Sequence, residues 1–165
     1  MKKNKDLLIG LLAVAVIIGG LIWVLPKPPE KKPPTASVNT AITPEEKYFD
    51  FGSISMAAGK VKHTYLVKND SDRPLTVDKV YTSCMCTEAS LINNGKKSGP
   101  FGMPGHGFSP GLKEVIGPQS TAEVEAEFDP AAHGPAGVGL IERSVIIEYE
   151  GVGQTELSFS AQVTP

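Results

Sequence analysis

The chain has 165 residues, enough for one domain of ordinary size with appendages. Its charge is uneven: residues 1–35 hold six lysines against two acidic residues, whereas the remainder holds 10 basic against 16 acidic residues. An acidic domain lacks the basic surface that binds the phosphates of nucleic acid, so nucleic acid is not an expected partner.

The first element that the sequence predicts is a membrane helix over residues 7–25, a run without a single charge. At about 1.5 Å per residue, a helix of this length matches the hydrocarbon core of a bilayer. A signal peptide would have a shorter apolar region and a small-x-small cleavage site, but Trp23 to Pro26 follow here. We therefore predict a signal anchor: residues 1–6 form a cytoplasmic flank, and the domain faces the periplasm or cell exterior.

Residues 26–47 predict a proline-rich linker. Pro26 to Pro34 contains five prolines, and because proline fixes φ and lacks an N–H donor, this stretch favours an extended, semi-rigid spacer. The linker would hold the following domain away from the bilayer.

From Tyr48 onward the recurring hydrophobic period is two. Apolar and polar residues alternate most clearly over residues 61–68, 122–128 and 157–163, with a further set over 145–149. In residues 75–80 the phase slips by one, which indicates a β-bulge. Six or seven short strands separated by turn residues predict an all-β fold, an immunoglobulin-like antiparallel β-sandwich over residues 48–165.

Several motifs in this region resemble a known family. Phe49-Asp50-Phe51-Gly52, the strand ending at Asn69 and Ser83-Cys84-Met85-Cys86-Thr87 resemble a bacterial family catalogued as domain of unknown function 1573. The usual motif of that family is Ser-Cys-Gly-Cys-Thr, and this chain has Met85 in place of glycine. The resemblance implies an immunoglobulin-like, commonly exported or membrane-anchored domain, and it implies no established activity.

Cys84 and Cys86 are the only cysteines. They share a phase with Val80 and Thr82, so we expect both thiols on one face of a strand or its extension. Two thiols placed in this way could bind one metal ion, form a strained disulfide or remain small buried side chains.

A glycine-rich insertion over residues 93–111 follows the cysteines. Nine of the 17 residues from Gly95 to Gly111 are glycine or proline, so we expect an irregular loop, of the kind that is often functional. It carries Met103 and His106, and a second loop, Asp129 to Gly139, carries His133. Thiolate, thioether and imidazole ligands suit Cu(I), and thiolate with imidazole suits Zn. The candidate metal ligands are Cys84, Cys86, His106, Met103 and His133.

These patterns together predict a membrane-anchored, extracytoplasmic binding module that is not an enzyme. No arrangement of residues indicates a catalytic acid–base pair. The expected partners are copper or zinc, or an envelope protein. If the partner is an envelope protein alone, the chain is a metal-free protein-interaction domain, which is the first alternative. A thiol–disulfide redox protein is the second, disfavoured because no helix N-terminus is expected near the thiols. His63, on an inward strand phase, is expected to be a hydrogen-bonded core residue.

Overall fold

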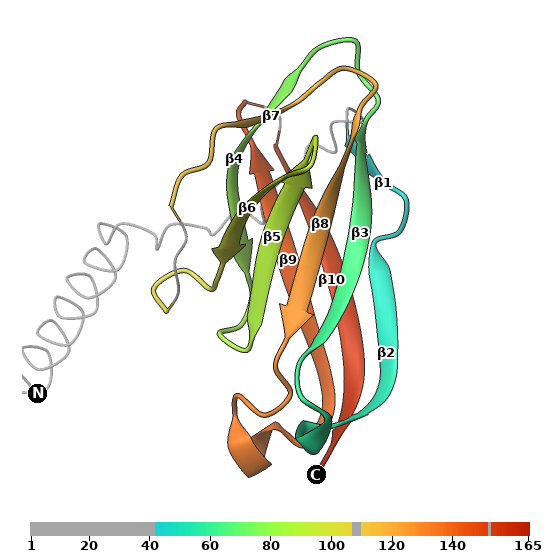
Figure 1. The fold of residues 1–165 in the computed structure, drawn as a ribbon, viewed down its shortest axis with the longest axis vertical. Helices are drawn as coiled ribbons and strands as arrows, with labels where there is room; N and C mark the ends of the chain where they lie inside the picture. The colour runs from blue at the N-terminus through green and yellow to red at the C-terminus, as the bar shows by residue number, and fades with distance from the viewer. Residues whose placement is uncertain (1–41, 107–109, 152) are drawn as a thin grey trace, which may run out of the picture. The chain divides into compact units, whose positions relative to one another are not determined.

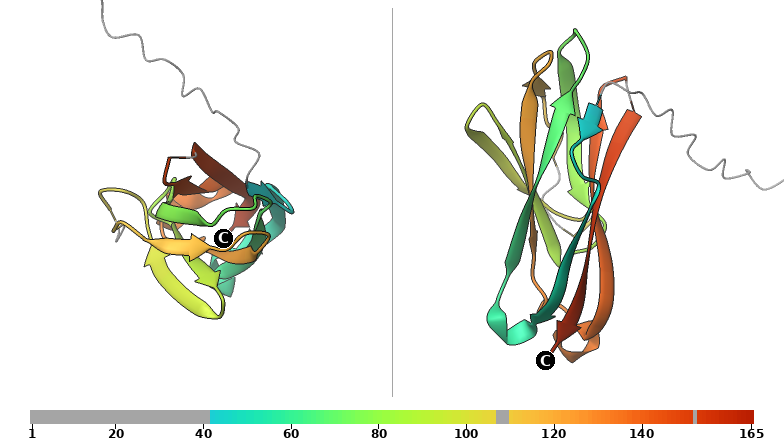
Figure 2. Two further views of the ribbon diagram at one scale, coloured as in Figure 1. Left: turned by 90° about the horizontal axis from the view of Figure 1, so that it is seen from above. Right: turned by 90° about the vertical axis from the view of Figure 1, so that its right-hand side faces the viewer.

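A computed structural model describes residues 42–106, 110–151 and 153–165 as two facing β-sheets (Figures 1 and 2). The first sheet has the order β1 (Ile42–Pro44), β3 (Val61–Asn69), β8 (Thr121–Phe128), β5 (Thr87–Asn93) and β6 (Lys96–Phe101). The second has the order β2 (Tyr48–Ser55), β10 (Gly153–Thr164), β9 (Gly139–Tyr149), β4 (Leu75–Thr82) and β7 (Glu114–Ile116). Two short 3₁₀ helices, η1 (Met56–Ala58) and η2 (Gly134–Gly137), complete this part of the chain. The predicted all-β sandwich is confirmed.

The alternating apolar residues form the core between the sheets. In β8 every second side chain, from Ala122 to Phe128, is buried, while the glutamates between them lie on the outer face. Tyr65 of β3 and Phe159 of β10 are fully buried and are among the largest such side chains. Burying a side chain of this size contributes about 1.5–3 kcal/mol. The period of two in the sequence therefore assigned the inward faces correctly.

The strand pairing differs from the prediction in two respects. The described residues form ten strands rather than six or seven, because β1, β6 and β7 are short and lack an apolar alternation. β2 also pairs with β10 in parallel, whereas an antiparallel sandwich was predicted. These two strands lie at opposite ends of the domain sequence, so no hairpin constrains their direction. The predicted bulge is confirmed by a register shift between Val77 and Lys79.

The sandwich begins earlier than the predicted boundary at Tyr48. β1 pairs antiparallel with β3, Ile42 lying opposite Asn69, so the end of the predicted linker belongs to a sheet. The predicted membrane helix at residues 7–25 and the linker up to residue 41 lie outside the described residues. In the part of the chain that is described, no helix has the length and apolar character needed to cross a bilayer.

The glycine-rich insertion contains regular structure, contrary to the expectation of an irregular loop. Its residues Lys96–Phe101 form β6, which pairs with β5. Gly99 has a φ of +117°, and a Cβ there would lie 2.9 Å from the Ala89 carbonyl oxygen, so glycine permits this close approach. Phe101 is buried and anchors the strand end to the core.

His63 has the environment expected of a hydrogen-bonded core residue. It is half-buried, its Nε2 lies 2.5 Å from a carboxylate oxygen of Glu46, and its ring stacks on Phe49 with centroids 3.7 Å apart. These contacts fix the ring at the edge of the aromatic core and leave it with a structural role.

Candidate functional site

The two cysteines lie in the turn that carries the chain from β4 in the second sheet to β5 in the first. The expectation that both project from one strand face is therefore wrong, because the strand ends at Thr82 to let the chain cross between sheets. The Thr87 N–H donates to the Cys84 carbonyl oxygen at 3.1 Å. The Thr82 hydroxyl donates to the carbonyl oxygens of Cys84 (3.0 Å) and Thr87 (2.9 Å), and it thereby fixes the turn from within.

Met85 occupies the exposed tip of this turn. Its side chain is 57% exposed, and the described non-glycine residues with positive φ are Asn94 and Gln119. The backbone at Met85 therefore does not require glycine, which explains why methionine can replace the glycine of the Ser-Cys-Gly-Cys-Thr motif.

Two neighbouring segments hold the cysteine turn in place at one end of the sandwich, where η1, η2 and the C-terminus also lie (Figure 1). The Asp129 N–H, just after β8, donates to the Cys86 carbonyl oxygen at 2.9 Å. Ser83 and Ser144 of β9 exchange two hydrogen bonds, one from each backbone N–H. These contacts bring the β8–β9 loop and strand β9 against the cysteines.

A cluster of four side chains results. The Sγ atoms of Cys84 and Cys86 and a ring nitrogen of His133 all lie within 4.8 Å of one another, and the distance from Cys84 Sγ to His133 Nε2 is 3.3 Å. Arg143, on β9, donates through Nε to Cys86 Sγ at 3.2 Å. Cys86 is buried, Cys84 and Arg143 are half-buried, and His133 is exposed, so the cluster opens to solvent on the His133 side.

The surroundings shift the pKa values of the two thiols in opposite directions. Burial raises the pKa of Cys84, but hydrogen bonds from the Cys86 side chain and N–H, together with His133 and Arg143, outweigh burial and bring it down to about 7. Burial, and then the hydrogen bond to Cys84, raise the pKa of Cys86 despite the bond from Arg143. Cys84 is therefore the thiol that ionises first.

One predicted ligand, His106, does not join this cluster. His106 is exposed and sits in a turn whose N–H donates to the Met103 carbonyl oxygen at 3.1 Å, and it is not among the grouped His, Cys, Asp and Glu side chains of the described residues. Met103 is half-buried in the same turn. The structure thus brings together Cys84, Cys86 and His133 of the five predicted ligands.

Arg143 is the member of the cluster that the sequence analysis missed. It lies on the same strand phase as Ile141, Val145 and Ile147, which are buried. A charged residue at an inward-facing position of a strand is unusual unless it has a partner, so this break in the apolar alternation was the signal that could have identified it.

The cluster supports two kinds of chemistry. Two thiols and one imidazole at these separations match the ligand types and spacing of a soft or borderline metal ion. Two adjacent thiols, one half-buried and one buried, can also exchange with a disulfide.

Comparisons with known proteins support the fold and say little about activity. The chain is 14% identical to a protein of unknown function from Porphyromonas gingivalis W83, with a TM-score of 0.54, covering 74% of this chain and 46% of that one. The chain therefore spans less than half of the length of that structure. It is also 12% identical to the PapD-like domain 7 of human CEP192, with a TM-score of 0.48, covering 83% and 92% of the two chains. No curated protein matches the sequence.

Residues 42–100, which include β1 to β5 and both cysteines, match the family described as "Protein of unknown function (DUF1573)". This match confirms the resemblance seen in the sequence motifs. What is shown is therefore a match of residues 42–100 to the DUF1573 family model.

Proposed function

We propose that this protein is a membrane-anchored, non-enzymatic binding module of the cell envelope that holds a copper or zinc ion at Cys84, Cys86 and His133. The observation that carries the proposal is the convergence of two sulfur atoms and one imidazole nitrogen within 4.8 Å. In a tetrahedral site with Zn–S of about 2.3 Å and Zn–N of about 2.0 Å, neighbouring ligand atoms lie about 3.5–3.8 Å apart. The 3.3 Å between Cys84 Sγ and His133 Nε2 is close to that spacing.

The envelope location rests on the N-terminal sequence. An uncharged run over residues 7–25 without a cleavage site after it favours a retained anchor, and the large domain after the linker would lie outside the cytoplasm. Protease added to intact cells, after removal of any outer barrier, should digest the domain. Protection until the cells are lysed would reverse the orientation, and a soluble form starting near Thr35 would indicate a signal peptide.

Metal binding can be tested on the reduced full-length protein in detergent. We expect one equivalent of Cu(I) or Zn per chain, with weaker binding in His133→Ala and weaker still in Cys84→Ser, because each change removes one ligand. The matched control is His106→Ala, an exposed histidine outside the cluster, which should bind as the wild type does. Absence of stoichiometric metal in the reduced wild type would contradict the proposal. It would then favour a metal-free interaction domain, a role with which the immunoglobulin-like fold is compatible.

A thiol–disulfide redox role is the second candidate, favoured by the asymmetric exposure of the two thiols. The half-buried Cys84 thiolate could attack a partner disulfide, forming a mixed disulfide and releasing one partner thiol. Cys86 would then attack Cys84 Sγ, forming the internal disulfide and releasing the second thiol.

This order of events makes the two cysteine variants differ. Cys86→Ser should accumulate the mixed disulfide, whereas Cys84→Ser should not, as judged by non-reducing electrophoresis after acid trapping. Equal behaviour of the two variants would argue against the redox role, and a pair that remains reduced and metal-bound in cells would support the metal site instead.

A further inference from the structure

We propose that Arg143 makes the cysteine–histidine cluster selective for a monovalent soft ion, Cu(I), over divalent zinc. This inference rests on the metal site proposed above and names the ion and the residue that selects it. Arg143 is not a ligand in this proposal. Its effect comes from a positive charge held against the buried sulfur.

The first argument is the charge of the occupied site. Two thiolates and a neutral imidazole give a complex of charge −1 with Cu(I) and 0 with Zn. The guanidinium of Arg143, whose Nε lies 3.2 Å from Cys86 Sγ, attracts the anionic complex and gains nothing from the neutral one. The Cu(I) and Zn complexes therefore differ by one unit of charge in the field of Arg143. The protonation state of the empty site does not change this difference, because both ions bind to the same empty site.

The position of Arg143 is fixed by the fold. A second donor, Nη1, bonds to the Glu142 carbonyl oxygen at 2.7 Å. On the same strand, the Ser144 N–H donates to the Ser83 hydroxyl oxygen at 2.9 Å, beside the cysteine turn. The guanidinium is half-buried, which weakens solvent screening of its charge. The charge is therefore part of the site and not a mobile surface group.

The second argument is the number of ligands. Among the described residues, the cluster of His, Cys, Asp and Glu side chains around the sulfur atoms has three members. Structural zinc sites are almost always four-coordinate, whereas soft thiolate ligands select Cu(I). Of the two ions, zinc would need a further ligand such as water. The number of ligands and the charge of the site therefore both favour Cu(I).

The size of the effect follows from Coulomb's law. One unit of charge at a separation of about 5 Å changes a binding constant by about fourfold in water and by more than about 100-fold at an effective dielectric constant of about 20. For a half-buried guanidinium we expect the ratio of Cu(I) to Zn affinity to fall by roughly tenfold or more when the charge is removed.

The test uses the full 165-residue chain, reduced and solubilised in detergent under anaerobic conditions. Cu(I) affinity is measured by competition with bicinchoninate and Zn affinity by competition with a chromophoric chelator. Arg143→Gln should lower the Cu(I)-to-Zn ratio by roughly tenfold or more, while Arg143→Lys, which keeps the charge, should retain most of the ratio. Arg73→Gln is the matched control, because Arg73 is exposed and on another loop, and it should leave the ratio unchanged.

Two results would overturn the inference without affecting the proposed metal site: an unchanged ratio in Arg143→Gln, or an equal loss in Arg143→Lys and Arg143→Gln. If Arg143→Gln fails to fold, Arg143→Leu provides a neutral side chain that suits the inward-facing position and offers no metal ligand. A wild type that binds neither ion would instead contradict the proposed function itself.

Discussion

At the scale of single residues, Asn69 shows how one buried polar side chain connects two loops. It is the last residue of β3 and is fully buried. Its Nδ2 donates to the carbonyl oxygens of Arg73 (2.8 Å), Ile116 (3.2 Å) and Gly117 (2.9 Å), and its Oδ1 accepts from the Ser71 N–H at 3.0 Å. The side chain thus joins the β3–β4 loop to the β7–β8 turn. This gives a structural reason for the asparagine in the family-like motif.

Replacing Asn69 by alanine should therefore destabilise the domain substantially. The change leaves several backbone groups without partners in buried or partly buried positions, and each fully buried group of this kind costs about 1–3 kcal/mol. We expect a loss of at least about 2 kcal/mol in the free energy of unfolding, measured by urea denaturation. Asp72→Ala, at an exposed position in the same loop, should change it by less than about 0.5 kcal/mol. Equal effects of the two variants would mean that the hydrogen bonds of Asn69 are not needed.

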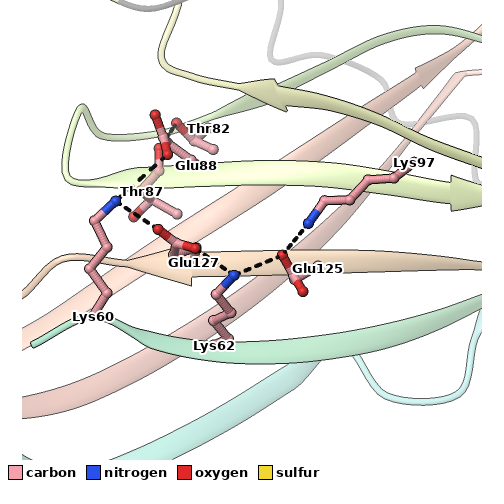
Figure 3. Close-up of polar contacts among 8 residues, drawn as sticks. All are labelled: Lys60, Lys62, Thr82, Thr87, Glu88, Lys97, Glu125 and Glu127. Atoms are coloured by element: carbon pink, nitrogen blue, oxygen red, sulfur yellow. Dashed lines mark hydrogen bonds and ion pairs between the residues drawn. The ribbon is translucent and has the colours of Figure 1, made fainter.

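At the scale of elements, the outer face of the first sheet carries a ladder of ion pairs across neighbouring strands (Figure 3). Lys62 of β3 bridges Glu125 (3.3 Å) and Glu127 (2.7 Å) of β8, and Lys60 pairs with Glu127 at 2.7 Å. Lys97 of β6 reaches Glu125 at 2.8 Å. The charges pair within the sheet, so this face does not present a surface of one sign.

The ladder predicts a pH-dependent contribution to stability. Hydrogen bonds from Lys60 and Lys62 lower the pKa of Glu127 from its ordinary value, and the bond from Lys97 does the same for Glu125. A carboxylate with a lowered pKa in the folded state stabilises above its unfolded pKa, and the contribution disappears as pH falls through the folded pKa. Glu127→Gln should therefore lower the Tm at pH 7, and the difference from wild type should shrink as pH falls below the unfolded pKa of about 4.3 and vanish below the lowered folded pKa.

The control for this prediction is Glu123→Gln. Glu123 lies on the same face of β8, is exposed and makes no ion pair with the described residues. Its replacement should have little effect on the Tm at either pH. The effect of Glu127→Gln should also diminish in about 1 M salt, because exposed ion pairs are screened. A Tm difference that does not shrink between pH 7 and about pH 2 would show that the ion pairs are not its cause.

At the scale of the whole molecule, residues Ala36–Pro165 form one compact unit whose core is supplied by the strands of both sheets. Phe128, the last residue of β8, is buried, and its ring lies 5.5 Å from that of Phe159 on β10 in the opposite sheet. This contact between sheets is the kind on which a sandwich core depends. The fragment Ala36–Pro165 should therefore fold without the N-terminal segment.

Phe128→Ala in this fragment should cost about 3–5 kcal/mol, because it removes a large buried ring and leaves a cavity between the sheets. Urea unfolding of the fragment provides the measurement. The control is Leu140→Ala, which also truncates a large apolar side chain but one that is 77% exposed. Its effect should stay within about 0.5 kcal/mol. A loss below about 1 kcal/mol for Phe128→Ala would mean that the ring contributes as a surface residue does.

The sequence by itself determined the sandwich and its inward faces. A period of two can be recognised from neighbouring residues alone, because adjacent side chains of a strand point to opposite sides of the sheet. The same local rule located the bulge at Val77 to Lys79. It could not locate β1, β6 and β7, because these short strands exist through their partners and not through a pattern of their own.

The composition of the cysteine site was decided by the tertiary structure. His106 is closer in sequence to Cys84 than His133 is, yet His133 lies 3.3 Å from Cys84 across 49 residues of sequence, and Arg143 meets Cys86 across 57 residues. Both contacts depend on the chain leaving β4 to cross into the other sheet and on the pairing of β8 with β5 and of β9 with β4. Side chains from separate loops and strands meet through this pairing of strands, and the local periodicity of a sequence carries no information about such pairing.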